Sequence, residues 1–443
     1  MTKKPSTDAY GRVIVTYGRS LMSLVAAQSL AKHGIDVVGC DSVDMTALRF
    51  SRFCGNYFTH PAPEHDEDAY MKYMCAMVER YKPDNDKPYI LMPLFDNARI
   101  LTRRQSELPD CITLAAPSAA SIDCVYPKDR LAKTMKAYPG IGPESAVISS
   151  MDDLRSAAEK MEFPLVLKPA EGVGGRGVTF VEDLDELESA ASALNLGLDQ
   201  APLILQETAP GEDFCMTALA HDGEICAAMA YKNLETFPKK SGAGTVRETV
   251  DHAPFMEATK KILGAAKWNG VAEIDFRWDG DPEKPAQLIE VNARFWAGLY
   301  HSMASGVDYP WLLYQLTAYG EVSESRAPEI GKVTKTPVLS TLSALSATLS
   351  RTFRFPLAKR IIGHGWRDVK AGNWRQGSAS IWRGLRSAIA FDRAAFTAME
   401  KFDETRSAPG EFDHAHDPYA GLGVLFILSS LMRHGRLPDE VKY

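Results

Sequence analysis

A glycine-rich hairpin over residues 165–181 is the feature that most constrains the fold. The sequence LVLKPAEGVGGRGVTFV places four glycines between two short apolar segments that read as strands. A dinucleotide-binding turn needs a helix after its glycines, and a Walker A loop needs Lys-Ser or Lys-Thr there. A kinase hairpin has its lysine downstream, whereas Lys168 precedes this one. Because glycines lose much backbone entropy on folding, we predict that the hairpin covers phosphates; a flexible surface hairpin is the alternative.

Two pairs of oxygen-bearing side chains occur in the second half of the chain. Glu273 and Asp275 are two apart in VAEIDF, and Glu290 and Asn292 are two apart in LIEVNAR. Residues two apart on a strand share a face. A solvated antiparallel sheet gives the same alternation, but these acids lie inside apolar runs. The pattern therefore predicts the hard oxygen ligands that Mg²⁺ uses beside nucleotide phosphates.

The order of elements predicts an α/β and α+β multidomain protein. Strands alternate with helices over residues 12–115, which indicates a parallel sheet. Residues 203–250 and 270–292 read as antiparallel strands, with Asp222-Gly223 as a hairpin turn. We expect an α/β domain over 1–122, a second domain over 123–320 and a mainly helical C-terminal extension over 321–443. The second domain would comprise a small subdomain at about 145–205 and a central sheet at about 206–320.

Composition excludes several classes of protein. A net charge of −7 and a pI of about 5.9 argue against a globally basic nucleic-acid-binding protein, so no nucleic acid is expected. The seven cysteines form no metal-binding spacing, and we expect all of them to be buried free thiols in a reducing compartment. Neither a signal peptide nor an apolar run of about 18 residues is visible. We therefore expect a cytoplasmic protein.

Three segments together resemble a known superfamily. In this order and spacing, LVLKPAEGVGGRGV, LILQETAPGED and AEIDF…LIEVNAR are similar to the ATP-grasp superfamily, specifically to the carboxylate–amine ligases related to biotin carboxylase and carbamoyl-phosphate synthetase. The resemblance covers roughly residues 10–320. It implies a pre-ATP-grasp domain over 1–122 and an ATP-grasp domain over 123–320 whose small subdomain is the lid. It also implies ATP and Mg²⁺ as cofactors, with Mn²⁺ as a substitute.

The same resemblance implies roles for individual residues. Those at the nucleotide would be Arg130 from the linker helix, Lys168 at the α-phosphate, the lid glycines Gly174, Gly175 and Gly177, the hinge residues Gln206, Glu207 and Ala209, and Glu212 at the ribose. The metal ligands would be Asp275, Glu290 and Asn292. Arg294 would steady the acyl phosphate, and Lys232 would contact substrate or phosphate. Glu273 is not a position to which the resemblance assigns a role, and we expect it to support its neighbours. Relatives often carry lysine in place of Arg130 and glutamate in place of Gln206.

The implied activity is the ATP-dependent joining of a carboxylate to an amine through an acyl phosphate, with release of ADP and phosphate. The partners would be small molecules, most simply amino acids or small peptides, and a homodimer is the common oligomer. One alternative is a carboxylase-type enzyme that activates a small acid. Another is an ATP-binding scaffold without turnover, against which the intact Lys168 and metal ligands argue.

Three further segments have two interpretations each. Asp96 and Asn97 follow a strand at the carboxyl end of the first sheet, where ligands bind, but either could simply cap a helix. The loop 239–247 could close over the acceptor or be merely mobile. Residues 351–386 carry nine Arg or Lys, one acid (Asp368) and Trp366, Trp374 and Trp382. This composition suits an anionic membrane or acidic partner, but we expect the tryptophans to be packed.

Overall fold

The structure is a computed structural model of the 443-residue chain, and it describes residues 10–171, 177–194, 202–237, 243–323 and 326–336. Further along it describes only 363, 366–367, 369–370, 373–374, 378–382, 409–410 and 417. The chain divides into two compact units. The first comprises residues 1–233, 247–332 and 411–443, and the second comprises 234–246 and 333–410. The boundary predicted near residue 122 falls inside the first unit, in α5 (Ala119–Val125).

The first half folds as the predicted parallel sheet. Its five strands have the order β3-β2-β1-β4-β5: β1 (Arg12–Val15), β2 (Asp36–Asp41), β3 (Asn56–Thr59), β4 (Tyr89–Met92) and β5 (Thr113–Leu114). The helices are α1 (Leu21–Lys32), α2 (Ala47–Phe50), α3 (Glu67–Arg80) and α4 (Asn97–Arg103), and a 3₁₀ turn (Gln105–Glu107) follows α4. The residues of β4 are all buried, as expected for a parallel strand covered on both faces. The strand order reverses between β1 and β4, and ligands bind beside such a switch point in open α/β sheets.

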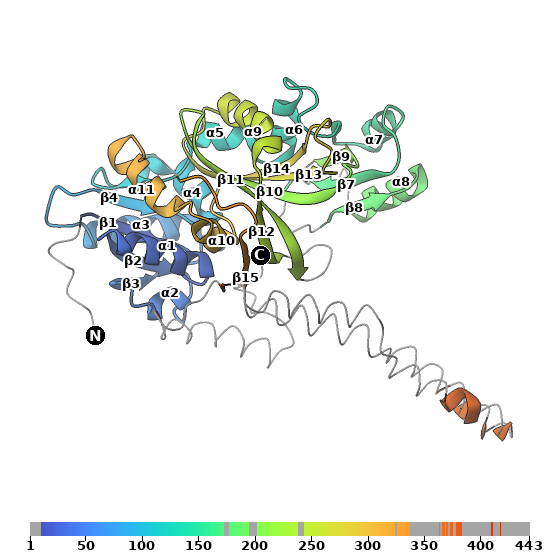
Figure 1. Cartoon of the computed structure of the whole chain (residues 1–443), viewed down its shortest axis with the longest axis horizontal. Coiled ribbons are helices and arrows are strands. Elements are labelled where there is room, and N and C mark those ends of the chain that lie inside the picture. The colour runs from blue at the N-terminus through green and yellow to red at the C-terminus, as the bar shows by residue number, and fades with distance from the viewer. Residues whose placement is uncertain are drawn as a thin grey trace. The chain divides into compact units, whose positions relative to one another are not determined.

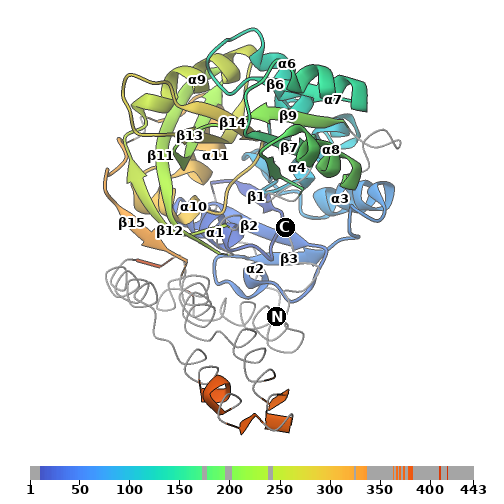
Figure 2. The same ribbon diagram turned by 90° about the vertical axis from the view of Figure 1, so that its right-hand side faces the viewer.

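The glycine hairpin belongs to a small antiparallel sheet of order β6-β9-β7-β8. Its strands are β6 (Ser145–Ile148), β7 (Leu165–Pro169), β8 (Thr179–Val181) and β9 (Leu203–Glu207), and helices α7 (Met151–Ala158) and α8 (Leu184–Ala193) pack against it (Figure 2). Strand β7 pairs antiparallel with β8, with Leu165 opposite Val181. The prediction of a strand–glycine–strand hairpin is thus confirmed, although residues 172–176 at its tip lie outside the described residues.

The central sheet has the order β14-β13-β10-β11-β12-β15. Its strands are β10 (Glu212–His221), β11 (Glu224–Phe237), β12 (Ala243–Val250), β13 (Gly270–Trp278), β14 (Gln287–Asn292) and β15 (Val333–Lys335). On one face of β10, β13 and β14 lie α5, α6 (Lys128–Met135) and α9 (Ala253–Ala265), which share a buried apolar cluster with these strands (Figure 1). The predicted turn at Asp222-Gly223 joins β10 to β11, and both residues have positive φ (50° and 85°), as a two-residue hairpin turn requires.

One sequence expectation about this sheet is wrong. The glycine-rich segment 239–247 is not a loop throughout, because Ala243 begins β12 and Arg247 is buried within it, at 2% exposure. Residues 238–242 lie outside the described residues. Residues 243–247 are therefore part of the sheet and do not form a loop that could close over a substrate.

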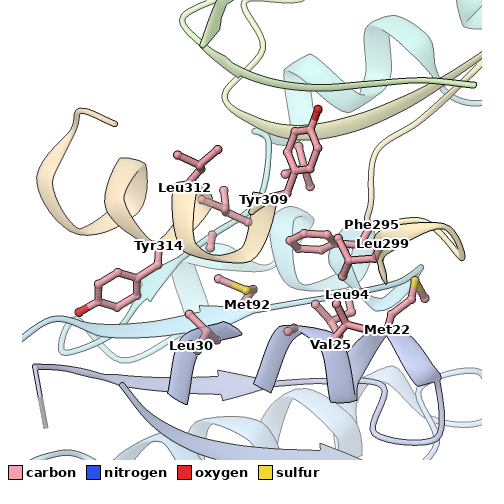
Figure 3. Packing of buried hydrophobic residues seen from close by; sticks show 14 of the residues in the cluster. Met22, Val25, Leu30, Met92, Leu94, Phe295, Leu299, Tyr309, Leu312 and Tyr314 are labelled. Atoms are coloured by element: carbon pink, nitrogen blue, oxygen red, sulfur yellow. The ribbon is translucent and has the colours of Figure 1, made fainter. Parts of the chain in front are cut away.

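The largest apolar cluster joins the parallel sheet to helices that follow β14 (Figure 3). It packs α1 and β4 against α10 (Leu299–Ala304) and α11 (Tyr309–Tyr319) through residues that include Met22, Val25, Met92, Phe295, Leu299 and Tyr314. Burying each such side chain contributes about 1.5–3 kcal/mol. The hydroxyl of Tyr309 also donates to the carbonyl oxygen of Thr217 on β10 at 2.9 Å. These contacts fix one face of the parallel sheet relative to the strands of the central sheet.

Two expectations about individual side chains are corrected. Among the cysteines, all of which are free, Cys40 and Cys215 are buried, but the other five are only partly so. The side chains of Trp366, Trp374 and Trp382 are 56%, 70% and 69% exposed, contrary to the expectation that they are packed. Most of the extension predicted to be helical lies outside the described residues. Among the helices that are described, none combines the length and apolar character needed to cross a membrane.

Candidate active site

The paired carboxylates lie together on one face of the central sheet. In the antiparallel pair β13–β14, Glu273 stands opposite Asn292 and Asp275 stands opposite Glu290. On the other side of β13, Cys215 of β10 is opposite Asp275. Because the side-chain period of a strand is two, the register directs all of these side chains to the same face. The sequence prediction that the two pairs share a face is confirmed.

Hydrogen bonds hold this face in place. The Asn292 amide donates to Asp275 at 3.3 Å, and its oxygen accepts a bond from the Arg294 guanidinium at 3.2 Å. The Cys215 thiol donates to Asp275 at 3.4 Å, and the Tyr231 hydroxyl donates to Glu273 at 2.7 Å. The Tyr231 hydroxyl thus fixes the carboxylate of Glu273 on this face.

The buried carboxylates of this face repel one another and are therefore suited to bind a divalent cation. Burial raises the pKa of Asp275 well above its ordinary value, and the charges of Glu273 and Glu290 raise it further. Burial likewise raises the pKa of Glu273, although Arg294 opposes the shift. Carboxylates crowded in this way are stabilised as anions by a bound cation. The oxygens of Asp275 and Glu290 are the hard ligands that suit Mg²⁺.

Lys168 lies buried on β7 beside the carboxylate face. Its ammonium donates to the amide oxygen of Gln206 on β9 at 2.8 Å, and the Gln206 amide nitrogen donates to the hydroxyl of Ser145 at 2.8 Å. Burial lowers the pKa of Lys168 to about 8; the charge of Glu290 opposes the shift and that of Lys128 adds to it. A neutral amide partner leaves the positive charge of Lys168 available to an anion.

A lysine that the sequence reasoning did not single out reaches the same face. The Lys128 ammonium lies 3.1 Å from a carboxylate oxygen of Glu290, and its side chain is 10% exposed. Lys128 begins α6, and its backbone N–H donates to the carbonyl of Ala170 just after β7, which ties the helix start to the glycine hairpin. Arg130, which the sequence placed at the nucleotide, is exposed. The structure therefore brings Lys128, rather than Arg130, to Glu290.

The segment after β9 is held by Arg277 of β13. The guanidinium of Arg277 donates to the carbonyl oxygens of Ala209 (2.9 Å) and Gly211. Gly211 has φ +93°, and a Cβ there would lie 2.0 Å from the carbonyl oxygen of Trp278, so only glycine fits. Glu207 ends β9, and Glu212 is exposed at the start of β10. The predicted hinge is thus a defined turn between the two sheets.

Lys232, which was predicted to contact substrate or phosphate, does not lie on the carboxylate face, and only one of the three predicted lid glycines is described. Strand alternation puts Lys232, which pairs with Phe214, on the face opposite the one shared by Tyr231 and Cys215. Lys232 forms an ion pair with Glu248 at 3.3 Å and is not brought to the carboxylates. Gly177 has φ +74° where the hairpin returns to β8, whereas Gly174 and Gly175 lie outside the described residues.

Sequence reasoning missed Lys128, Tyr231 and Cys215. Their signals were weak: Lys128 follows Pro127 at a helix start, where either Lys128 or Arg130 could face the sheet. Tyr231 and Cys215 lie in apolar strands, and only the register shows that they adjoin the carboxylates. Strand register cannot be read from one strand alone.

Two protein-family models match adjoining parts of the chain. Residues 128–201 match the carbamoyl-phosphate synthase L chain, ATP binding domain, and residues 199–337 match an ATP-grasp family described as occurring in the biosynthetic pathway with the Ter operon. Together these segments contain Lys168, Gln206, Asp275 and Glu290. The matched families are thus ATP-grasp families over the region that holds the site.

Curated relatives agree with this assignment. The carbamoyl phosphate synthase large chain of Clostridium beijerinckii is 21% identical over 401 residues, which are 86% of this chain and 36% of that protein. The phosphoribosylamine–glycine ligase of Lactococcus lactis is 24% identical over 163 residues, or 37% of this chain and 38% of that protein. The chain thus spans about a third of the length of the first of these relatives.

Solved structures share the fold. Biotin carboxylase from Campylobacter jejuni, in complex with β,γ-ATP, has a TM-score of 0.56 and 16% identity over 72% of this chain and 73% of that one. N5-carboxyaminoimidazole synthetase from Staphylococcus aureus, complexed with ADP, has a TM-score of 0.57 and 14% identity, and the match covers 76% of this chain and 84% of that one. L-amino acid ligase from Bacillus licheniformis has a TM-score of 0.53 and 17% identity, and the match covers 72% of this chain and 75% of that one. Together, these matches relate the chain to the ATP-grasp carboxylate–amine ligases, and the structure has the ATP-grasp fold.

Proposed function

We propose that this protein is an ATP- and Mg²⁺-dependent ligase that activates a carboxylate as an acyl phosphate, joins it to an amine and releases ADP and phosphate. The substrates we propose are amino acids or small peptides. The single observation that carries the proposal is the pairing of Asp275 with Glu290, with Lys128 bound to Glu290 and Arg294 bound to Asn292. Anionic ligands for a metal and cations for phosphates therefore adjoin one another on one face.

The chemistry explains why such a face is needed. A carboxylate resists attack because its leaving group would be oxide. When a carboxylate oxygen takes the γ-phosphoryl group of ATP, ADP leaves and an acyl phosphate forms. The amine nitrogen then forms a bond to the acyl carbon, the carbon–oxygen bond to phosphate breaks, phosphate leaves with the electron pair, and the nitrogen loses a proton. Positioning and neutralisation of charge are the main tasks left to the protein.

Each residue has a task in this scheme. Lys168 and Lys128 would bind the phosphate oxygens of ATP, and the turn at Ala209 would hold the base. Asp275 and Glu290, with Asn292, would hold Mg²⁺, which neutralises phosphate charge when bound. Arg294 would bind the acyl phosphate. The glycine hairpin would cover the phosphates and limit hydrolysis of the intermediate.

Release of ADP by the purified full-length protein tests this proposal. The assay would combine ATP, Mg²⁺ and the proteinogenic amino acids, singly and in pairs, with Glu290→Ala as the inactive control and Glu283→Ala, in the exposed turn between β13 and β14, as the matched control. ADP release that requires both an acid and an amine and is lost only in Glu290→Ala supports the ligase. Formation of AMP and pyrophosphate would exclude the acyl-phosphate route.

A further inference from the structure

The carboxylate of Asp96 lies next to the proposed acyl-phosphate site without serving as a helix cap. Asp96 follows β4 at the carboxyl end of the parallel sheet and occupies the N-cap position of α4, but its side chain makes no capping hydrogen bond. For Asp96, the capping interpretation is therefore wrong. Its neighbour Asn97 has a structural task, because it accepts a bond from Thr16 at 3.2 Å and donates one to Tyr70 at 3.4 Å.

Two arginines approach Asp96, but neither makes a hydrogen bond with it. Its carboxylate lies 3.8 Å from the Nε of Arg294 and 3.8 Å from a terminal nitrogen of Arg99. Both distances exceed those of a hydrogen bond. Each guanidinium lies over an aromatic ring instead: Arg294 is 4.6 Å from the centroid of Phe95, and Arg99 is 4.1 Å from that of Tyr126. The Asp96 side chain is 40% exposed, so its oxygens keep capacity to accept bonds from a ligand.

Arg294 connects Asp96 to the metal face. The same guanidinium that approaches Asp96 donates to Asn292 at 3.2 Å and lies 3.9 Å from Glu273. A group bound to Asp96 would therefore lie one side chain away from the acyl phosphate that Arg294 would hold. From this position an amine would be near the acyl carbon. The acyl phosphate would offset the charge of Arg294, and Arg99 lies over the ring of Tyr126 without a hydrogen bond to Asp96, so a cation can be accommodated beside Asp96.

We propose that Asp96 binds the ammonium group of the amine substrate, which releases one proton to solvent before its nitrogen attacks the acyl carbon. This inference rests on the proposed ligase function and narrows it: the amine is one that is cationic in solution, such as the α-ammonium group of an amino acid or peptide. A partly exposed carboxylate beside Arg294 selects such a group by charge and by accepting its N–H bonds. An uncharged amine gains no comparable ion pair.

A comparison of two nucleophiles tests the inference. Hydroxylamine is uncharged at neutral pH and converts any acyl phosphate into a hydroxamate, whereas amino-acid amides are ammonium ions that can act only as amines. The acid is first found by forming hydroxamate with wild-type protein and the proteinogenic amino acids. The amides are then offered with that acid to wild type, Asp96→Asn, Asp96→Glu and Asp110→Asn. Asp110 is an exposed aspartate in the same half of the chain and serves as the matched control.

The expected result is a change of selectivity. In Asp96→Asn, kcat/KM for the amide falls about tenfold or more relative to kcat/KM for hydroxylamine, mainly through KM, since a hydrogen bond to a charged group contributes about 1.5–3 kcal/mol. Asp96→Glu restores part of this ratio, and Asp110→Asn keeps it. Thermal melting of each variant checks that the fold is retained.

Other outcomes overturn the inference in distinguishable ways. If Asp96→Asn lowers both reactions equally, Asp96 only positions Arg294 or Arg99. If the ratio is unchanged, or if wild type forms hydroxamate but uses none of the amides, Asp96 does not select an ammonium group. The absence of hydroxamate with any acid would instead contradict the proposed ligase function itself.

Discussion

The ammonium of Lys168 on β7 and the amide oxygen of Gln206 on the adjacent strand β9 lie 2.8 Å apart, and both side chains are buried. A glutamate at position 206 would form an ion pair and neutralise the lysine. Glutamine accepts the same hydrogen bond without adding a negative charge. Burial lowers the pKa of Lys168 from its ordinary 10.5 to about 8, although the nearby charge of Glu290 opposes the shift. The protonation state of Lys168 can therefore change within an accessible pH range.

The pH dependence of ADP binding should report Lys168. Protonated Lys168 attracts phosphate, so the affinity of the free protein for ADP should fall as pH rises through about 8. In Gln206→Glu, the added negative charge raises the pKa of Lys168, so the fall should move to higher pH. Calorimetric titration with ADP between pH 6.5 and 9.5, a range spanning the lowered pKa, measures both curves. Identical midpoints in the two proteins would show that Lys168 is not the titrating group.

Lys128 should contribute more than Arg130 to ADP binding, although the two residues are only two positions apart on α6. Lys128→Ala removes a buried cation from Glu290 and should weaken ADP binding about tenfold or more. Arg130→Ala removes an exposed side chain and should have the smaller effect. Dissociation constants for ADP in the two variants make the comparison. A larger loss in Arg130→Ala would favour the assignment made from the sequence resemblance.

Mg²⁺ should stabilise the protein more at higher pH. Burial raises the pKa values of Asp275 and Glu273 in the folded state, so their contribution to stability is present below their unfolded values and is lost as pH rises. A bound cation favours the anions and offsets that loss. At about 100 times its dissociation constant, a ligand contributes about 2.7 kcal/mol of stability.

The increase in melting temperature caused by Mg²⁺ without nucleotide, measured at pH 6 and pH 8, tests this expectation. The increase should be larger at pH 8 and should disappear in Glu290→Gln but not in Glu283→Gln, which changes an exposed residue of the β13–β14 turn. An increase that survives in Glu290→Gln would mean that the metal binds elsewhere.

Gly211→Ala should destabilise the protein more than Gly280→Ala. Both glycines have positive φ (93° and 83°), so alanine carries a similar backbone cost at each, about 1–2 kcal/mol. A Cβ at Gly211 would also collide with the backbone of Trp278, whereas nothing lies within 4 Å of a Cβ at Gly280. Chemical denaturation of the two variants measures the difference. Equal losses would show that the turn before β10 shifts easily.

The features that sequence could predict depend on local periodicity. The alternation in VAEIDF and LIEVNAR is enough to place Glu273 and Asp275 on one face, and the lack of a helix after Gly177 is enough to identify a hairpin. These inferences need only the two-residue period of a strand. The parallel sheet likewise follows from strands that alternate with helices.

The features that could not be predicted depend on contacts distant in sequence. Whether Lys128 or Arg130 faces Glu290 is decided by the bond between the start of α6 and Ala170, which single-sequence reasoning cannot see. The face occupied by Lys232 is set by its pairing with Phe214. Ala243 and its successors read as a glycine-rich loop, but pairing within the central sheet makes them a strand, because tertiary context overrides intrinsic preference.

The apolar cluster between α1 and α11 has a consequence for attempts to alter the substrate range by building chimeras. Met22 and Met92 come from the first 122 residues, but their packing partners Phe295 and Tyr314 come from the far end of the ATP-grasp region. A donor segment that replaces residues 1–122 would have to pack against Phe295 and Tyr314 of the recipient as well as its own Met22 and Met92 do. Redesign of substrate specificity is therefore better confined to exposed residues around Asp96, because substitutions there do not change the apolar cluster.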